Sequence, residues 1–248
     1  MIDRTAIADA DPPLGDHACL DAESRADGVP LLSFEGVWRH WGRGRARWAV
    51  LRDINLQLPP RTAACVRGCN GAGKTTLLRI ATGILAADRG TVTVDQLTAA
   101  HSWREYHRRI GFVSAGDRGL YARVSVRGHL EYFAAQLFVP RAERGRVVAA
   151  SLERFGLLEL AQRRADRLSQ GQRQRLRIAA SLLHSPRVLL LDEPRNSLDG
   201  DGLETLTGAV SELVAGGGAV IWCAPAGEDQ SFQFDQMWVI EDGRLVAE

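Results

Sequence analysis

The chain has 248 residues, of which 45% are hydrophobic and 25% charged, and its formal net charge is +1. This length is enough for one large domain with a sizeable core, and the near-neutral charge gives no global reason to expect nucleic acid or an acidic membrane surface as partner. The four cysteines form no CxxC pair and the six histidines show no metal spacing beside them, which argues against a zinc site. No apolar run is long enough to span a bilayer and the N-terminus lacks a secretory signal pattern, so we expect an intracellular protein.

The first residues differ in composition from the rest of the chain. Residues 1–29 carry seven acidic and two basic side chains with few large apolar groups. Such a composition buries too little apolar surface to fold, so we expect residues 1–30 to form a disordered acidic tail. Order is expected from Leu31 onward, with strands at 31–34, 50–58 and 62–67.

The third of these strands runs into a glycine-rich segment that holds the single lysine of the chain. Gly68, Gly73, Lys74 and Thr75 match the spacing G-x-x-x-x-G-K-[ST]. In such a loop successive backbone N–H groups face phosphate oxygens, an ammonium reaches between the β- and γ-phosphates, and a hydroxyl binds magnesium. Apolar residues at helical spacing predict a helix over 74–85. Strand, glycine loop and helix in this order predict a phosphate-binding site.

Helices and short apolar strands alternate through the rest of the chain. Periodicity predicts a strand at 91–94, a mainly helical region at 125–184, a helix near 203–214, and strands at 188–191, 219–223, 237–241 and 244–246. We interpret the seventeen arginines between Arg104 and Arg187 as solvated faces of amphipathic helices rather than a nucleic-acid interface. The pattern predicts an α/β core interrupted by a helical insertion.

Two acids follow the apolar run at 188–191. A buried strand that ends in Asp192 places a carboxylate where it can hold magnesium, directly or through water. Glu193 then lies near the γ-phosphate, where it can accept a proton from attacking water.

The segment Leu168-Ser169-Gln170-Gly171-Gln172 precedes these acids, and Ser197-Leu198-Asp199 follows them. Here the chain resembles the ATP-binding subunits of ABC transporters, whose signature LSGGQ differs at one residue. The resemblance covers about residues 31–246. It implies an α/β fold with a P-loop NTPase (RecA-like) core, an antiparallel β subdomain and an inserted helical subdomain at about 114–170, in one ATP-binding domain at 31–248.

The resemblance also implies a site for ATP and Mg²⁺. Glu193 is the expected catalytic residue, and Thr75 and Asp192 are the expected magnesium ligands. The residues expected to bind ATP are Trp41, Gly68, Cys69, Asn70, Gly71, Ala72, Gly73, Lys74, Thr75, Thr76, Ser169, Gly171, Gln172 and Asp199. Trp41 is expected to stack on adenine, with Trp38 as the alternative ring, or with Trp41 filling the core instead.

Five positions bear on how fast such a site works. Ala115 stands where the family has a glutamine that contacts magnesium and attacking water, and Pro225 stands in place of a switch histidine. Gln170 replaces a signature glycine and Arg195 replaces a threonine, while Asp117 lies near enough in sequence to reach the metal. These departures affect hydrolysis more than binding, so we expect a slow ATPase, or alternatively a subunit that binds ATP without hydrolysing it.

The resemblance further implies partners. A second ATP-binding subunit, identical or different, docks head to tail, so that its signature closes over the γ-phosphate held at Lys74. A separate transmembrane permease subunit is expected to contact Asp117–Ala134, a segment whose sequence resembles exporter subunits for polysaccharides, lipids or drugs. The chain itself is expected to be cytoplasmic and peripheral on the inner face of the cell membrane. We expect no fused membrane domain and no nucleic-acid partner. A soluble ABC ATPase acting on DNA or ribosomes is a rival, disfavoured because the sequence shows no coiled-coil or zinc insertion and no second cassette.

Overall fold

The computed structural model describes residues 29–42, 44–116, 119–227 and 232–248. Residues 1–28 of the expected acidic tail and Asp117 therefore lie outside the described residues. Within the described ranges, no helix is both long enough and apolar enough to cross a bilayer.

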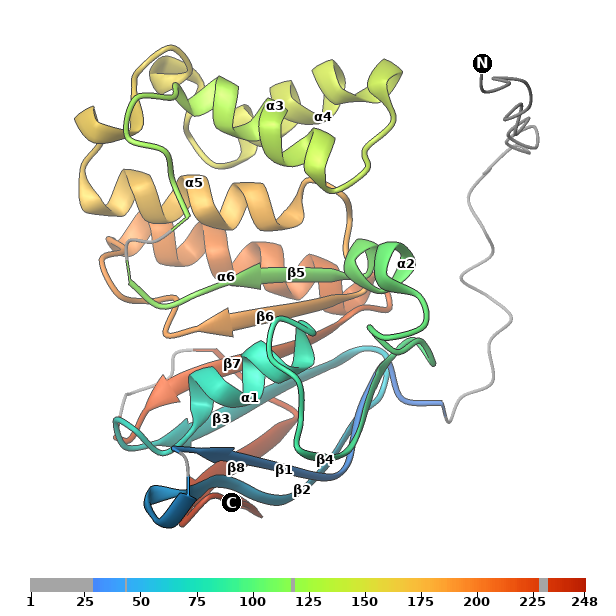
Figure 1. Ribbon diagram of the computed structural model, residues 1–248. Helices are drawn as coiled ribbons and strands as arrows, with labels where there is room; N and C mark the ends of the chain where they lie inside the picture. The colour runs from blue at the N-terminus through green and yellow to red at the C-terminus, as the bar shows by residue number, and fades with distance from the viewer. Residues whose placement is uncertain (1–28, 43, 117–118, 228–231) are drawn as a thin grey trace, which may run out of the picture.

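The strands form two sheets, one antiparallel and the other mainly parallel (Figure 1). An antiparallel sheet has the order β2-β1-β4 and comprises β1 (Leu32–Trp41), β2 (Trp48–Leu58) and β4 (Arg89–Val94). The second sheet has the order β5-β6-β7-β3-β8-β9 and is parallel except at β9. Its strands are β3 (Thr62–Gly68), β5 (Ile110–Val113), β6 (Val188–Asp192), β7 (Ala219–Pro225), β8 (Gln236–Glu241) and β9 (Arg244–Ala247). The α/β fold class with an antiparallel sheet beside a P-loop core is confirmed.

The helices cover the parallel sheet on both faces. They are α1 (Lys74–Ala81), α2 (Trp103–Arg108), α3 (Val126–Gln136), α4 (Arg141–Arg154), α5 (Gln170–Leu182) and α6 (Gly200–Ala215). Strand side chains alternate between faces, so Leu189 and Trp222 pack with α5 and α6, whereas Leu190 and Ile221 pack with α1. Helices α1 and α5 therefore lie on opposite faces of the sheet, and α3 and α4 form a further layer over α5 (Figure 1).

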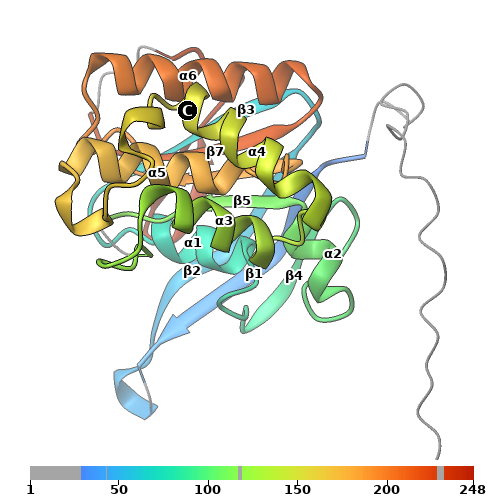
Figure 2. The same cartoon turned by 90° about the horizontal axis from the view of Figure 1, so that it is seen from above.

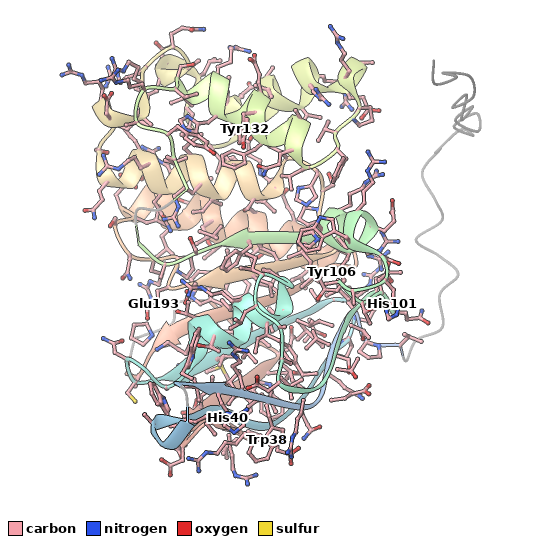
Figure 3. The ribbon with its side chains drawn as sticks, viewed as in Figure 1. Trp38, His40, His101, Tyr106, Tyr132 and Glu193 are labelled. Atoms are coloured by element: carbon pink, nitrogen blue, oxygen red, sulfur yellow. The ribbon has the colours of Figure 1, made fainter. Side chains whose placement is uncertain are left out.

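The loops that follow the parallel strands gather at one edge of the sheet. Strands β3, β6 and β7 all run in the same direction, and they end at Gly68, Asp192 and Pro225. In Figure 3, Glu193 lies at this edge, whereas Tyr106 lies toward the opposite one. Ligands of open α/β sheets bind at the carboxyl edge, so this edge is where a site is expected.

Several elements differ from the sequence-based expectation. Helix α1 ends at Ala81 rather than at residue 85, because Gly83 takes a left-handed φ of 73° and the Thr82 hydroxyl donates to the carbonyl of Arg79. Strand β1 continues to Trp41, and the β1–β2 hairpin extends away from the body of the molecule (Figure 2). Helix α4 begins at Arg141, within the mainly helical region expected at 125–184. Neither α2 nor β5 was expected as an element.

Candidate functional site

The glycine-rich loop joins β3 to α1 and is shaped by close contact with β2. Gly73 precedes α1 with a φ of 116°, and a Cβ there would lie 2.9 Å from Leu51 Cδ2 and 3.2 Å from the carbonyl oxygen of Val50. Only glycine fits this conformation and this contact at once. The antiparallel sheet therefore sits directly against the loop.

Lys74 is folded back into the loop. Its side chain is 5% exposed, and Nζ donates to the carbonyl oxygens of Gly68 at 2.6 Å and Cys69 at 3.2 Å. The same ammonium lies 3.7 Å from Glu193 Oε1. A phosphate oxygen that enters the loop meets a cation that is already positioned, because an ammonium holds three donors on one compact group.

Thr75 and Asp192 meet although 117 residues separate them in sequence. The Thr75 hydroxyl donates to Asp192 Oδ2 at 2.8 Å, and the backbone N–H of Ala115 donates to the same oxygen at 3.4 Å. The other oxygen, Oδ1, is buried and has no hydrogen-bond partner among the described residues. Burial raises the pKa of Asp192, and the hydrogen bonds from Thr75 and Ala115 oppose that rise.

Glu193 stands at a sharp bend after β6. Its φ is 49°, a left-handed conformation that is costly for a residue other than glycine. The bend is held by a hydrogen bond from its N–H to the carbonyl oxygen of Cys223 at 3.0 Å. Asn196 Nδ2 donates to Glu193 Oε2 at 3.1 Å, so the carboxylate lies between an amide and the Lys74 ammonium.

Ser169 caps the helix that carries the signature-like segment. Its hydroxyl accepts from the N–H of Gln172 at 3.2 Å, and its own N–H donates to Gln172 Oε1 at 3.0 Å, which completes a capping box. A Cβ on Gly171 would lie 2.8 Å from the carbonyl oxygen of Ser197. The signature-like segment at 168–172 therefore contacts the segment at 197–199. Asp199 caps α6, with Oδ1 accepting from the N–H of Gly202 at 2.9 Å.

Two exposed indoles lie at the turn end of the β1–β2 hairpin. Trp41 is 36% exposed, and the Arg39 guanidinium lies 5.0 Å from its ring centroid. Trp48 pairs with Trp41 across the hairpin and is 57% exposed. Trp38 instead stacks against His40 with 6.2 Å between ring centroids (Figure 3). Trp41 is therefore not core filling, and Trp48 is a second aromatic candidate that the sequence reasoning missed.

Comparison with known proteins identifies the family. The model of the family described as "ABC transporter" matches residues 51–196. The chain is 38% identical over 73% of its length, and 68% of the relative's, to the zinc import ATP-binding protein ZnuC of Cereibacter sphaeroides. It is 33% identical over 88% of its length, and 67% of the relative's, to the daunorubicin resistance ATP-binding protein DrrA3 of Streptomyces coeruleorubidus.

The chain belongs to the ABC transporter family. It is an ATP-binding subunit of that family, of the class that hydrolyses ATP. A dimeric structure of a post-hydrolysis state of an ATP-binding cassette bound to ADP and Pi has the same fold, with a TM-score of 0.79 at 22% identity over 88% of this chain and 97% of that one.

The structure places the departures from the ABC pattern around the acidic pair. Pro225 ends β7 opposite Gly68 in the pairing with β3, and it has no N–H to donate. Ala115 contributes its backbone N–H to Asp192 and no side-chain amide. Gln170 lines a cavity of about 380 Å³ together with Glu193. The carbonyl oxygen of Arg195 accepts from the N–H of Leu198 at 3.0 Å.

A separate apolar groove of about 490 Å³ opens beside β5 in this ABC subunit. Its walls come from α2, β5, α3 and α5, and include Trp103, Phe112, Phe133, Phe138, Arg177 and His184. His184 Nε2 lies 3.0 Å from the carbonyl oxygen of Ile110, and burial lowers the pKa of His184 to about 4. Arg177 and Gln174, which sequence reasoning did not single out, line the cavity beside Glu193, and Arg177 also lines this groove.

Proposed function

We propose that this subunit binds Mg–ATP at the loop of residues 68–76 and hydrolyses it slowly to drive export through a separate transmembrane subunit. The observation that carries the proposal is that two pairs of residues, far apart in sequence, lie close together in the structure. Lys74 reaches Glu193 at 3.7 Å, and Thr75 reaches Asp192 at 2.8 Å. A phosphate-binding loop next to a buried carboxylate and a carboxylate base is what phosphoryl transfer requires.

The oxygens around Asp192 suit a magnesium ion. Magnesium prefers hard oxygen donors, and the Thr75 hydroxyl and Asp192 Oδ1 supply a neutral and an anionic one. Oδ1 has no hydrogen-bond partner within the described ranges, as expected of an oxygen reserved for a cation. When bound, the ion would neutralise phosphate charge. Thr75 and Asp192 would hold it there.

Glu193 is proposed as the general base. Lys74 and Asn196 fix its carboxylate, and the strained bend keeps it at the edge where the loop begins α1. Neither Ala115 nor Pro225 offers a side chain that could stabilise developing charge. Each such lost contact costs about 2–4 kcal/mol of barrier, which supports slow turnover.

A second ATP-binding subunit is proposed to complete the site. Ser169 begins α5 on one face of the sheet, whereas Lys74 begins α1 on the other. The N-terminus of α5 and its exposed Ser169 form a positive end suited to an anion. A copy docked head to tail would bring such an end to the nucleotide, and on this basis Ser169, Gly171 and Gln172 are proposed to bind ATP.

The apolar groove beside β5 is proposed to receive a helix of the transmembrane subunit. Its exposed rim includes Trp103, at 58%, and Ile84, at 65%, and exposed apolar surface of this kind marks protein contacts. With this contact, the subunit is proposed to lie at the inner face of the membrane. The named relatives include an import protein and a resistance protein, so export is proposed from the sequence pattern near Tyr121 and Tyr132.

The test is phosphate release in liposomes that contain this subunit together with its transmembrane partner. We expect Glu193→Gln to lower the rate about 10²–10⁴-fold while Mg–ATP still binds. Glu153→Gln, at an exposed position on α4, is the matched control and should keep the wild-type rate. Equal rates for wild type and Glu193→Gln would reject catalysis by Glu193.

One alternative has support from particular residues. Because Ala115 and Pro225 lack the groups that assist hydrolysis, the chain can serve as an ATP-sensing partner in an asymmetric pair. The same experiment separates the two functions. A sensing subunit binds Mg–ATP in calorimetry, and its substitution at Glu193 leaves phosphate release by the pair unchanged.

A further inference from the structure

Arg177 lies between the groove and the acidic pair and is held by a dense set of hydrogen bonds. It projects from α5 and is 9% exposed. Its guanidinium donates to the carbonyl oxygens of Ser114 and Gly116, to Ser114 Oγ at 3.0 Å and to Gln174 Oε1 at 2.8 Å. A planar fork with five N–H donors can satisfy several fixed acceptors at once, which an ammonium cannot do in the same geometry.

Two of these acceptors flank Ala115, and this fixes the direction of its N–H. The carbonyl of Ser114 and the N–H of Ala115 belong to one planar trans peptide, so they point in opposite directions. When Arg177 holds the carbonyl, the N–H is aimed the other way. It points at Asp192 Oδ2, 3.4 Å away.

The orientation of the Asp192 carboxylate depends on this amide. Oδ2 accepts from Thr75 on one side and from Ala115 on the other, and Oδ1 is left without a partner among the residues described. With Oδ2 occupied twice, the carboxylate presents Oδ1 as its free ligand. The backbone at position 115 thus acts on the cation site without a side chain.

Arg177 is also linked, through Gln174, to the bend that carries Glu193. Gln174 is 6% exposed, accepts from Arg177, and donates through Nε2 to the carbonyl oxygen of Pro194 at 3.0 Å. Pro194 directly follows Glu193, whose φ of 49° needs external support. One guanidinium is therefore connected to the surroundings of both acids.

We propose that Arg177 is a positioning residue that aims the Ala115 amide at Asp192 and, through Gln174, supports the bend at Glu193. The proposal rests on the proposed function of this site in binding Mg–ATP. The side chain of Ala115 cannot order the cation site, and the proposal gives that role to an arginine on α5.

The experiment measures how ATP binding depends on the Mg²⁺ concentration, using a fluorescent ATP analogue and no turnover. Arg177→Lys keeps the charge and loses the fork, and we expect it to raise the half-saturating Mg²⁺ about tenfold, as when a hydrogen bond to a charged group is lost. Nucleotide affinity without Mg²⁺ should change less than about twofold, because the phosphate loop is untouched. Arg144→Lys is the matched control, since Arg144 Nε also donates to a backbone carbonyl, that of Val139 at 2.8 Å, in the helical region.

A second variant removes the backbone N–H of Ala115 directly. Ala115→Pro deletes the N–H while Arg177 remains, and it should shift the Mg²⁺ dependence in the same direction. This variant also covers the case in which Arg177→Lys does not fold. The proposal is overturned if the variants that fold keep the wild-type Mg²⁺ dependence, or if Arg144→Lys shifts it equally. Failure of hydrolysis in the Glu193 experiment would leave this binding measurement readable, so the two proposals fail separately.

Discussion

Trp41 and Trp48 face each other beside the turn of the β1–β2 hairpin, and both are exposed. The Arg39 guanidinium lies over the Trp41 ring, 5.0 Å from its centroid. Since β2 continues from Trp48 to the residues that touch Gly73, the hairpin end is linked directly to the phosphate loop.

We predict that Trp41→Ala weakens ATP binding by about 1–3 kcal/mol, the typical contribution of an aromatic ring stacked on a base. Trp48→Ala tests the second ring, and Trp103→Ala, at an exposed tryptophan of α2, is the control. Calorimetric titration with Mg–ATP measures all three. An unchanged affinity in Trp41→Ala with a loss in Trp48→Ala would move the adenine site to the ring that the sequence reasoning overlooked.

Residues of the site were predictable from sequence where their role depends on neighbours in the chain. The loop of residues 68–76 and the strand that ends in Asp192 are such local patterns. Arg177 was not predictable, because its acceptors at Gly116 and Ser114 lie 61 and 63 residues away and are backbone carbonyls. Any residue presents a carbonyl, so no sequence pattern marks one as a partner.

Among the elements, α5 combines a structural and a proposed ligand-binding role at a single residue. Ser169 closes a capping box, and its exposed N-terminal end is also the proposed anion site for a second subunit. Ser125 caps α3 by accepting from the N–H of Gly128 at 3.1 Å, without a capping box. Comparing substitutions at Ser169 and Ser125 therefore separates the capping role of Ser169 from its proposed role in binding an anion.

We predict that Ser169→Ala lowers the free energy of unfolding by about 0.5–2 kcal/mol, and Ser125→Ala by a similar amount. Ser169→Asp should keep the stability, because aspartate caps as well as serine, but its charge repels phosphate. Sedimentation with Mg–ATP, using Glu193→Gln as background, measures dimer formation. Dimers should persist in Ser125→Ala and disappear in Ser169→Asp. Full dimer formation by Ser169→Asp would remove this residue from the ATP site.

Element boundaries show where sequence periodicity stops being informative. The strands at 62–67, 188–191 and 219–223 are buried apolar runs, and the structure has β3, β6 and β7 there. The pattern after Ala81 stays apolar, yet the helix ends because Gly83 turns left-handed and packs near Ala99. Tertiary contact decided that boundary, and the short α2 and β5 were missed for the same reason.

For the whole molecule, two buried histidines make stability depend on pH. Burial lowers the pKa of His184 to about 4 and lowers the pKa of His129, whose Nε2 accepts from the N–H of Tyr121 at 2.8 Å. Below the unfolded value of about 6.5, the unfolded chain binds protons that the folded chain refuses. Stability is therefore fully present above pH 6.5 and is lost as the pH falls toward 4.

We predict that the lowered pKa of His184 alone reduces the free energy of unfolding by up to about 3 kcal/mol as the pH falls from 6.5 to 4. Asp192 acts in the opposite sense, because its pKa is raised in the folded state. Urea unfolding at pH 7.5, 6 and 5 measures the loss, and His184→Gln should reduce its slope. A slope equal to that of the wild type would show that His184 does not carry the effect.

The single lysine of the chain has a practical consequence. Lys74 is the one side-chain amine among 31 basic residues, and it is buried with its ammonium turned toward Gly68 and Glu193. A lysine-specific protease has one target bond in the sequence, between Lys74 and Thr75, at the first turn of α1. Cleavage there, or acylation of that side-chain amine, reports the opening of this one loop, because the sequence holds no other lysine.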